Sequence, residues 1–211
     1  MTIRQAIEAV ARHMPEVRRP AKKLGLGERL IWTAIVLVIY TLMSHTFLYG
    51  VPQAASIAER NPMILNIIFA QRIGTLTTLG IGPIVTAGLI LQLLVGAELI
   101  KLDLSKPEDR ATFTAASKVF TLIVIFFEAA VFTVSGMLGR LSPNVQVLVF
   151  LQLVAATMLI MFMDELIQKG WGLGSGVSLF IAAGVAENIL TSLLSPIMLP
   201  DGYYQGIILA M

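Results

Sequence analysis

The sequence contains no cysteine and little charge. The absence of cysteine excludes disulfide scaffolds, thiolate metal sites and cysteine nucleophiles. Charged residues make up only 13% of the 211 residues, about half of the usual share in a soluble domain. Disorder is excluded because disordered chains are polar and charged. A formal net charge of only +2 argues against direct nucleic-acid readout.

Catalytic and metal-binding patterns are also missing. The two histidines, His13 and His45, lie on separate segments, and no HExxH or other metal-ligand spacing occurs. Residues 172–176 resemble a phosphate loop, but the lysine that such a loop requires is absent. The same run resembles the turn of an intramembrane serine protease, which would need glycine where Leu173 stands. We therefore predict that the protein is neither an enzyme nor a metal-binding protein.

Apolar residues account for 56% of the sequence, with a mean hydropathy of +0.83. A soluble protein of this size lacks the interior volume to bury so much apolar surface. Long stretches carry no charge or, in the case of 119–139, only Glu128, and a membrane-spanning helix needs ~20 mostly apolar residues. Five stretches meet or approach that length: 30–50, 73–97, 119–139, 141–163 and 170–186. The sequence thus predicts an all-α membrane protein, a polytopic helical bundle of about five transmembrane helices.

The predicted boundaries follow from these stretches and from the polar segments between them. They are a cytosolic amphipathic helix and basic linker (1–29), the first span (30–50), an outer loop with a short re-entrant helix (51–72), the second span (73–97), a cytosolic loop (98–117), the third span (118–139), an outer turn and fourth span (140–163), a cytosolic glycine-rich loop (164–175), the fifth span (176–195), and an outer loop with the start of a sixth span (196–211).

The basic residues predict the orientation. If the N-terminus is cytosolic, twelve of the fifteen Lys and Arg residues fall in cytosolic segments, and Arg60, Arg72 and Arg140 fall outside. Cytosolic segments of membrane proteins are enriched in Lys and Arg, so this topology is favoured over its reverse. The leader begins with a capping box at Thr2 and Gln5 and has an apolar face. It fits either a helix packed on other cytosolic parts or a helix lying on anionic lipid.

A half-length apolar segment follows the first span. Asn61 is a good helix N-cap and Pro62 suits the first helical position, so a short helix should begin there. Its apolar run ends near Ala70 and is far too short to cross a bilayer. Two interpretations stay open, a re-entrant element that plugs a cavity and an outer helix resting on the membrane surface.

The second and fifth spans are rich in glycine rather than in lipid-facing side chains. Glycine and proline inside a span favour close helix packing or a broken helix, which is typical of a permeation path. Ile81 and Val85 lie four residues apart on one of these spans, and Val177 and Ile181 lie four apart on the other. Stiff β-branched side chains suit a defined ring, although ordinary core packing explains the same spacing.

Glu128 lies midway along the third span. A carboxylate at membrane depth is costly, so it should face a polar partner or a water-filled cavity. Thr86 and Gln92 on the second span are candidate neighbours. A functional role is the first interpretation of such a residue, and a structural hydrogen bond between helices is the alternative.

Three motifs of the sequence are specific in their order and spacing: residues 72–96 (RIGTLTTLGIGPIVTAGLILQLLVG), residues 102–110 (LDLSKPEDR), and Asp164-Glu165 followed by residues 172–184 (GLGSGVSLFIAAG). Together they resemble the SecY family, the channel subunits of the protein translocon, and its archaeal branch in particular. The family has ten spans in two inverted halves of five. The resemblance covers the first half and the start of the sixth span, so it implies one inverted-repeat half of such a channel.

The resemblance implies roles for particular residues. The positions that match the hydrophobic ring at the waist of the channel are Ile81, Val85, Val177 and Ile181. Those that match the lateral gate are Thr86 and Glu128, and Arg72 and Gly74 match the hinge of the plug. The plug itself matches Pro62, Met63, Ile64, Leu65, Ile67, Ile68, Phe69 and Ala70.

The resemblance also implies a function and partners. The channel would pass nascent or unfolded polypeptides across the plasma membrane and release transmembrane segments sideways into lipid, without a cofactor. The implied partners are signal sequences and nascent chains, a SecE-type subunit, a small beta-type subunit, the ribosome and the lipid bilayer. The residues alone leave two alternatives: half of a secondary transporter or ion channel with broken helices and a mid-membrane glutamate, and a non-conducting membrane scaffold.

Overall fold

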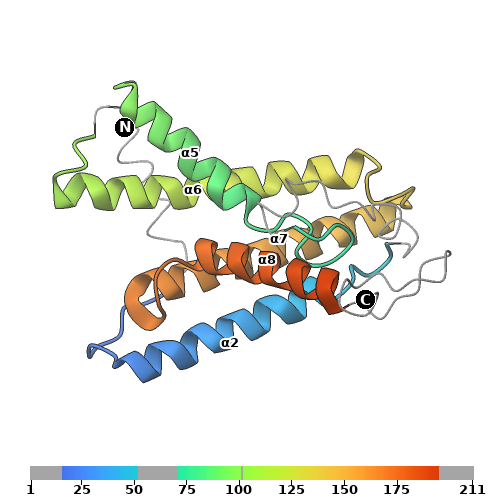
Figure 1. Ribbon diagram of the computed structural model, residues 1–211. Coiled ribbons are helices and arrows are strands. Elements are labelled where there is room, and N and C mark those ends of the chain that lie inside the picture. The colour runs from blue at the N-terminus through green and yellow to red at the C-terminus, as the bar shows by residue number, and fades with distance from the viewer. Residues whose placement is uncertain (1–15, 52–70, 101, 195–211) are drawn as a thin grey trace.

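The computed structural model describes residues 16–51, 71–100 and 102–194 (Figure 1). These residues form α2 (Leu26–His45), α5 (Gly82–Gly96), α6 (Pro107–Val134), α7 (Pro143–Leu166), a π-helical turn η1 (Ile167–Trp171) and α8 (Gly176–Leu194). The described chain is otherwise irregular apart from one isolated antiparallel bridge, between Phe47 and Thr75. The all-α class predicted from the sequence is therefore confirmed.

Local sequence signals explain where these helices begin. Proline occupies the first or second helical position of α5, α6 and α7, where its missing N–H costs no hydrogen bond. At the start of α2, the Glu28 carboxylate accepts a hydrogen bond of 3.0 Å from the Gly25 N–H. At the end of η1, Gly170 adopts a φ of +100°, a conformation that favours glycine, and the chain turns toward α8.

Three helices of the described chain are long and apolar enough to cross a bilayer: Leu26–His45, Asp109–Val134 and Pro143–Trp171. Two more are apolar but shorter, Gly82–Gly96 and Gly176–Leu190. Large apolar side chains such as Leu42, Leu93 and Val147 are exposed on the outside of the bundle. Such surfaces suit a lipid environment rather than water.

The observed helices differ from the predicted spans at several ends. α2 ends at His45, five residues before the predicted end at 50, and α6 begins at Pro107 inside the predicted cytosolic loop. The largest difference lies in the second span, where the predicted segment 73–97 is helical only from Gly82 to Gly96. Gly74 and Gly80 have φ values of +86° and +55°, and these left-handed conformations keep residues 73–81 out of a helix.

Two apolar clusters form the core on either side of α7. The first joins α2, α7 and α8 and contains Ile81, and the second joins α6 and α7 and contains Leu79. Figure 1 shows α5 and α6 crossing one side of the bundle while α2 and α8 lie along the other. The irregular segment 71–81 thus contributes a buried side chain to both clusters and connects the two sides.

Candidate functional site

The segment 71–81 is irregular yet largely buried. Three of its threonines, Thr75, Thr77 and Thr78, are at most 2% exposed. Two of the hydroxyls bond to the local backbone: Thr78 Oγ1 accepts from the Gly74 N–H at 3.1 Å, and Thr75 Oγ1 donates to the Arg72 carbonyl at 2.7 Å. The Thr77 hydroxyl lies 3.0 Å from the Thr75 hydroxyl. Irregular backbone at membrane depth is tolerated only where protein satisfies its polar groups. The threonines meet this requirement and allow a short α5 to replace a full span.

A pair of backbone bonds ties this segment to the end of α2. Leu48 N–H donates to the Gly74 carbonyl at 3.0 Å, and Leu76 N–H donates to the Thr46 carbonyl at 2.9 Å. The predicted hinge residues Arg72 and Gly74 therefore lie in a hydrogen-bonded turn rather than in a free loop. The predicted plug residues, 62–70, lie outside the described residues.

The two apolar pairs predicted to form a ring meet in the first apolar cluster. Ile81 directly precedes α5 and is fully buried, and Val85 follows one turn later on α5. Val177 and Ile181 lie in the first turns of α8, and both pack with Val85 against the same cluster as Ile81. The cluster also contains Tyr40 of α2 stacked on Phe180 of α8, with ring centroids 4.5 Å apart. Residues from two separate segments are thus brought together.

Glu128 is half-buried on α6, beside the start of α5. A Cβ atom at Gly82 would lie 3.6 Å from Glu128 Oε2 and 3.1 Å from Gln71 Nε2, so the Glu128 and Gln71 side chains both approach the backbone at the start of α5. Gln71 is itself fixed by donating to the Leu79 carbonyl at 3.0 Å. Of the two neighbours predicted on α5, Thr86 is half-buried and Gln92 is exposed. Sequence reasoning missed Gln71, because its position depends on how the irregular segment folds back.

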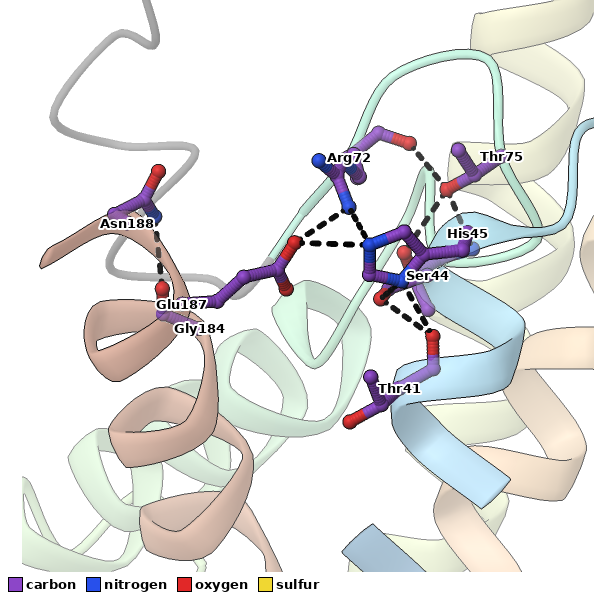
Figure 2. Close-up of polar contacts among 9 residues, drawn as sticks. Thr41, Ser44, His45, Arg72, Thr75, Gly184, Glu187 and Asn188 are labelled. Carbon is purple, nitrogen blue, oxygen red and sulfur yellow. Dashed lines mark hydrogen bonds and ion pairs between the residues drawn. The ribbon is translucent and has the colours of Figure 1, made fainter. Parts of the chain in front are cut away.

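Three charged or titratable side chains meet at the far end of α2 and α8 (Figure 2). Arg72 Nη1 lies 2.7 Å from Glu187 Oε1 and 3.1 Å from His45 Nε2, and His45 Nε2 lies 3.3 Å from Glu187 Oε1. We call these three residues the outer ion triad. It joins α2, the segment 71–81 and α8.

The hydrogen bonds of His45 define its neutral tautomer. His45 Nδ1 lies 2.9 Å from the Thr41 carbonyl oxygen, which can only accept a hydrogen bond. Nδ1 of the neutral ring therefore carries the proton, and Nε2 accepts from the Arg72 guanidinium. A carboxylate near the end of a span, such as that of Glu187, can reach the membrane interface, so its position in the sequence does not mark it as a site. Arg72 and Glu187 are 115 residues apart in the sequence, so no local sequence pattern indicates this pair.

A second network of ion pairs lies at the C-terminal end of α7, where α7 continues into η1. Glu165 Oε1 accepts from Lys118 Nζ at 2.7 Å and from Lys169 Nζ at 2.9 Å, and Lys169 also pairs with Glu16. The hydrogen bond and charge of Lys169 hold the pKa of Glu16 below its ordinary value. Nearby, Trp171 Nε1 donates to the Arg18 carbonyl at 2.8 Å. These contacts dock the segment 16–18 on the bundle.

Comparison with known proteins identifies the family. Residues 75–210 match the family model described as SecY. The chain belongs to the SecY family. It is 45% identical over 205 residues to "Protein translocase subunit SecY" of Pyrococcus furiosus, a match that covers 95% of this chain and 43% of the relative. The resemblance to the SecY family predicted from the sequence motifs is confirmed.

Solved structures of SecY-type channels show the same fold. The structure described as "The structure of a protein conducting channel" superposes with a TM-score of 0.80 at 40% identity and covers 96% of this chain and 44% of that one. "Sec61 in the Canine ribosome-channel complex from the endoplasmic reticulum" gives the same values: a TM-score of 0.80, 40% identity, and 96% and 44% coverage. The chain therefore spans under half the length of the relatives it matches.

Proposed function

We propose that this chain forms one half of a protein-conducting channel that passes unfolded polypeptides across a membrane and releases apolar segments sideways into lipid. The observation that carries the proposal is the meeting of Ile81, Val85, Val177 and Ile181 in one apolar cluster within a SecY-family fold. The names of two relatives, a translocase subunit and a protein-conducting channel, support the same function. They do not favour the alternative of a secondary transporter half.

In this proposal the four residues, which we call the ring residues, form half of an apolar constriction. A narrow apolar ring resists wetting, so ions do not pass while no polypeptide occupies it. The remaining ring members come from the second half of a complete channel. The short segment 62–70 is proposed as the plug of the outer funnel and residues Arg72 and Gly74 as its hinge, on the strength of the family resemblance alone.

The lateral gate is proposed to involve Thr86 and Glu128. Thr86 lies on α5 and Glu128 on α6, two helices that pack on each other, and both residues are half-buried. A sufficiently apolar segment would leave through such a gate because burying CH₂ groups in lipid is favourable by ~0.8 kcal/mol each. A carboxylate at the gate influences how apolar the segment must be, since it weakens the apolar contact that holds the gate closed.

The proposed setting is a plasma membrane with the N-terminus in the cytosol. The distribution of Lys and Arg supports this orientation, and the Lys118–Glu165–Lys169 network lies at the end proposed to be cytosolic. The proposed partners are nascent chains and signal sequences, SecE-type and small beta-type subunits, and the ribosome. A ribosome partner is supported by the ribosome–channel complex that contains the canine Sec61 relative.

Photo-crosslinking of a stalled nascent chain tests the proposal. In the complete channel complex, a crosslinker at Val85 or Ile181 should react with the translocating chain. The same crosslinker at Val147 or Leu151, which are 61% and 59% exposed on the outside of α7, is the matched control and should react with lipid instead. Crosslinks at Val147 equal to those at Val85, or none at Val85 in an actively translocating preparation, would contradict the channel proposal.

A further inference from the structure

Asp164 lies in the last turn of α7, yet it caps the start of α8. Its side chain is buried, with an exposed fraction of 6%, and Oδ1 accepts the Val177 N–H at 3.0 Å. Oδ2 accepts from the Gln168 side-chain amide at 2.7 Å, so both carboxylate oxygens are bonded. The first N–H groups of a helix have no partner within the helix, and an acceptor supplied from elsewhere stabilises the helix start. Here the acceptor comes from thirteen residues earlier in the chain.

The backbone contact beside this cap is equally close. A Cβ atom on Gly176 would lie 2.6 Å from the Asp164 Cα atom, so the first residue of α8 packs directly on the α7 backbone and must be glycine. The intervening chain is held as well, since the Leu173 N–H donates to Thr33 Oγ1 of α2 at 3.0 Å. The start of α8 is therefore fixed against α7 by the Asp164 carboxylate and by close packing of the backbone at Gly176.

The group that Asp164 holds is the backbone of a ring residue. Val177 donates the capping hydrogen bond, and Ile181 follows one helical turn later on the same face. A shift or rotation of α8 at Gly176 moves both side chains within the cluster that contains Ile81. The positions of Val177 and Ile181 along the axis of α8 thus depend on where the Asp164 carboxylate lies.

We propose that Asp164 is a positioning residue for the apolar constriction, which it sets through the Val177 amide, with Gln168 orienting the carboxylate. This inference rests on the proposed channel function. Asp164 touches no translocating chain in this proposal. Its effect reaches the constriction through the start of α8.

Ion leak through the resting, complete channel complex tests this role. Asp164→Ala removes the capping acceptor, and loss of such an acceptor shifts a local equilibrium about 2- to 30-fold, so the leak should rise by about that factor. Asp164→Asn keeps an oxygen that can accept from Val177 and should lie much closer to the wild-type leak. A residue needed only for its buried charge would give the same leak in both variants, and that result would overturn the proposal.

Thiol labelling gives a second readout that is independent of conductance. Val177→Cys or Ile181→Cys introduces the thiol at the ring, and Val147→Cys is the lipid-facing control; the 211 residues themselves contribute no other cysteine. Asp164→Ala should change the labelling rate at 177 and 181 and leave the rate at 147 unchanged. Equal rates at 177 and 181 in wild type and variant would overturn the proposal.

Two further variants separate the possible failures. If Ile81→Gly with Val85→Gly raises the leak and Asp164→Ala does not, the positioning role falls while the channel proposal stands. If the ring variant also leaves the leak unchanged, the ring assignment itself is wrong.

If the Asp164→Ala complex fails to assemble, the leak of Gln168→Ala tests the positioning role instead, because Gln168 is exposed and orients the same carboxylate. A raised leak then supports the proposal, and a wild-type leak overturns it.

Discussion

The Arg72 guanidinium lies 2.7 Å from the Glu187 carboxylate, and the two residues belong to the two different elements that carry the proposed ring residues. Arg72 lies near the start of the irregular segment that ends in Ile81, whereas Glu187 follows Val177 and Ile181 on α8. His45 of α2 contacts both partners. One ion triad therefore links the two elements that carry the ring residues, at the end opposite the Asp164 cap.

A charge reversal tests whether this triad stabilises the bundle. Exposed ion pairs contribute ~0.2–1 kcal/mol, and the side chains of Arg72 and Glu187 are 47% and 32% exposed. We expect Arg72→Glu or Glu187→Arg to lower the free energy of unfolding by about 1 kcal/mol, because each places like charges together. The double reversal should restore at least half of the loss in thermal unfolding of the purified complex. Arg140→Glu, at an exposed residue outside the triad, is the control for charge alone.

The constriction is tested by shortening its side chains. Ile81→Gly with Val85→Gly should raise the resting ion leak of the complete channel several-fold, because a wider and less apolar ring is more easily wetted. Glycine also weakens a helix by ~1 kcal/mol per position, so a matched control is needed. Leu89→Gly with Leu93→Gly supplies it, since these residues lie on the exposed face of the same helix. Equal leak in both double variants would remove the ring assignment.

The carboxylate of Glu128 should influence which signals open the lateral gate. Replacing Glu128 by Leu removes a polar group that costs ~2.5–3.5 kcal/mol at the centre of a membrane helix and leaves an apolar contact in its place. We expect this apolar contact to stabilise the closed gate, so a more hydrophobic signal sequence should be needed to open it. Translocation of a series of signals with graded hydrophobicity measures the threshold.

Glu128→Gln is the control for shape, because it keeps the side-chain size and a hydrogen-bonding group. Its threshold should lie between those of wild type and Glu128→Leu. A threshold that does not move in either variant would leave Glu128 with a structural role only.

The sequence predicted the spans better than their ends or their contacts. Uncharged stretches located the membrane helices because hydropathy reports the part in contact with lipid. The same signal misses the start of α6, where Asp109 and Arg110 extend the helix beyond the apolar part. Glycines and Pro83 indicated a break in the second span, but the short helix from Gly82 depends on threonine hydroxyls that satisfy the preceding backbone.

The candidate site shows the same limit. The spacing of Ile81 with Val85 and of Val177 with Ile181 is local, so the sequence could indicate both pairs. The contacts that hold these pairs in place are not local. Asp164 and Val177 are separated by thirteen residues and a π-helical turn, and Arg72 and Glu187 by 115 residues. Such pairs follow from the packing of whole helices, which hydrophobic periodicity does not encode.

Docking of the segment 16–18 should depend on pH. Lys169 holds the pKa of Glu16 below its ordinary value, so the carboxylate is more stable as an anion when docked than when undocked. A carboxyl group whose pKa is lowered in the docked state favours docking above its ordinary pKa, and this contribution is lost as the pH falls through the lowered value. We therefore expect the segment to detach on acidification, at a pH below the ordinary glutamate pKa of about 4.3.

Fluorescence of Trp171 reports this change, because its Nε1–H donates to the Arg18 carbonyl in the docked segment. In a version of the complex with Trp171 as its single tryptophan, acidification should shift the emission to longer wavelength as the indole becomes hydrated. Glu16→Gln should show the shifted emission already at neutral pH, since a neutral amide cannot pair with the Lys169 ammonium. Glu98→Gln, which changes an exposed carboxylate at the far end of α5, should behave as wild type. Emission that stays constant between pH 7 and pH 3 would show that the Glu16–Lys169 pair does not hold this segment in place.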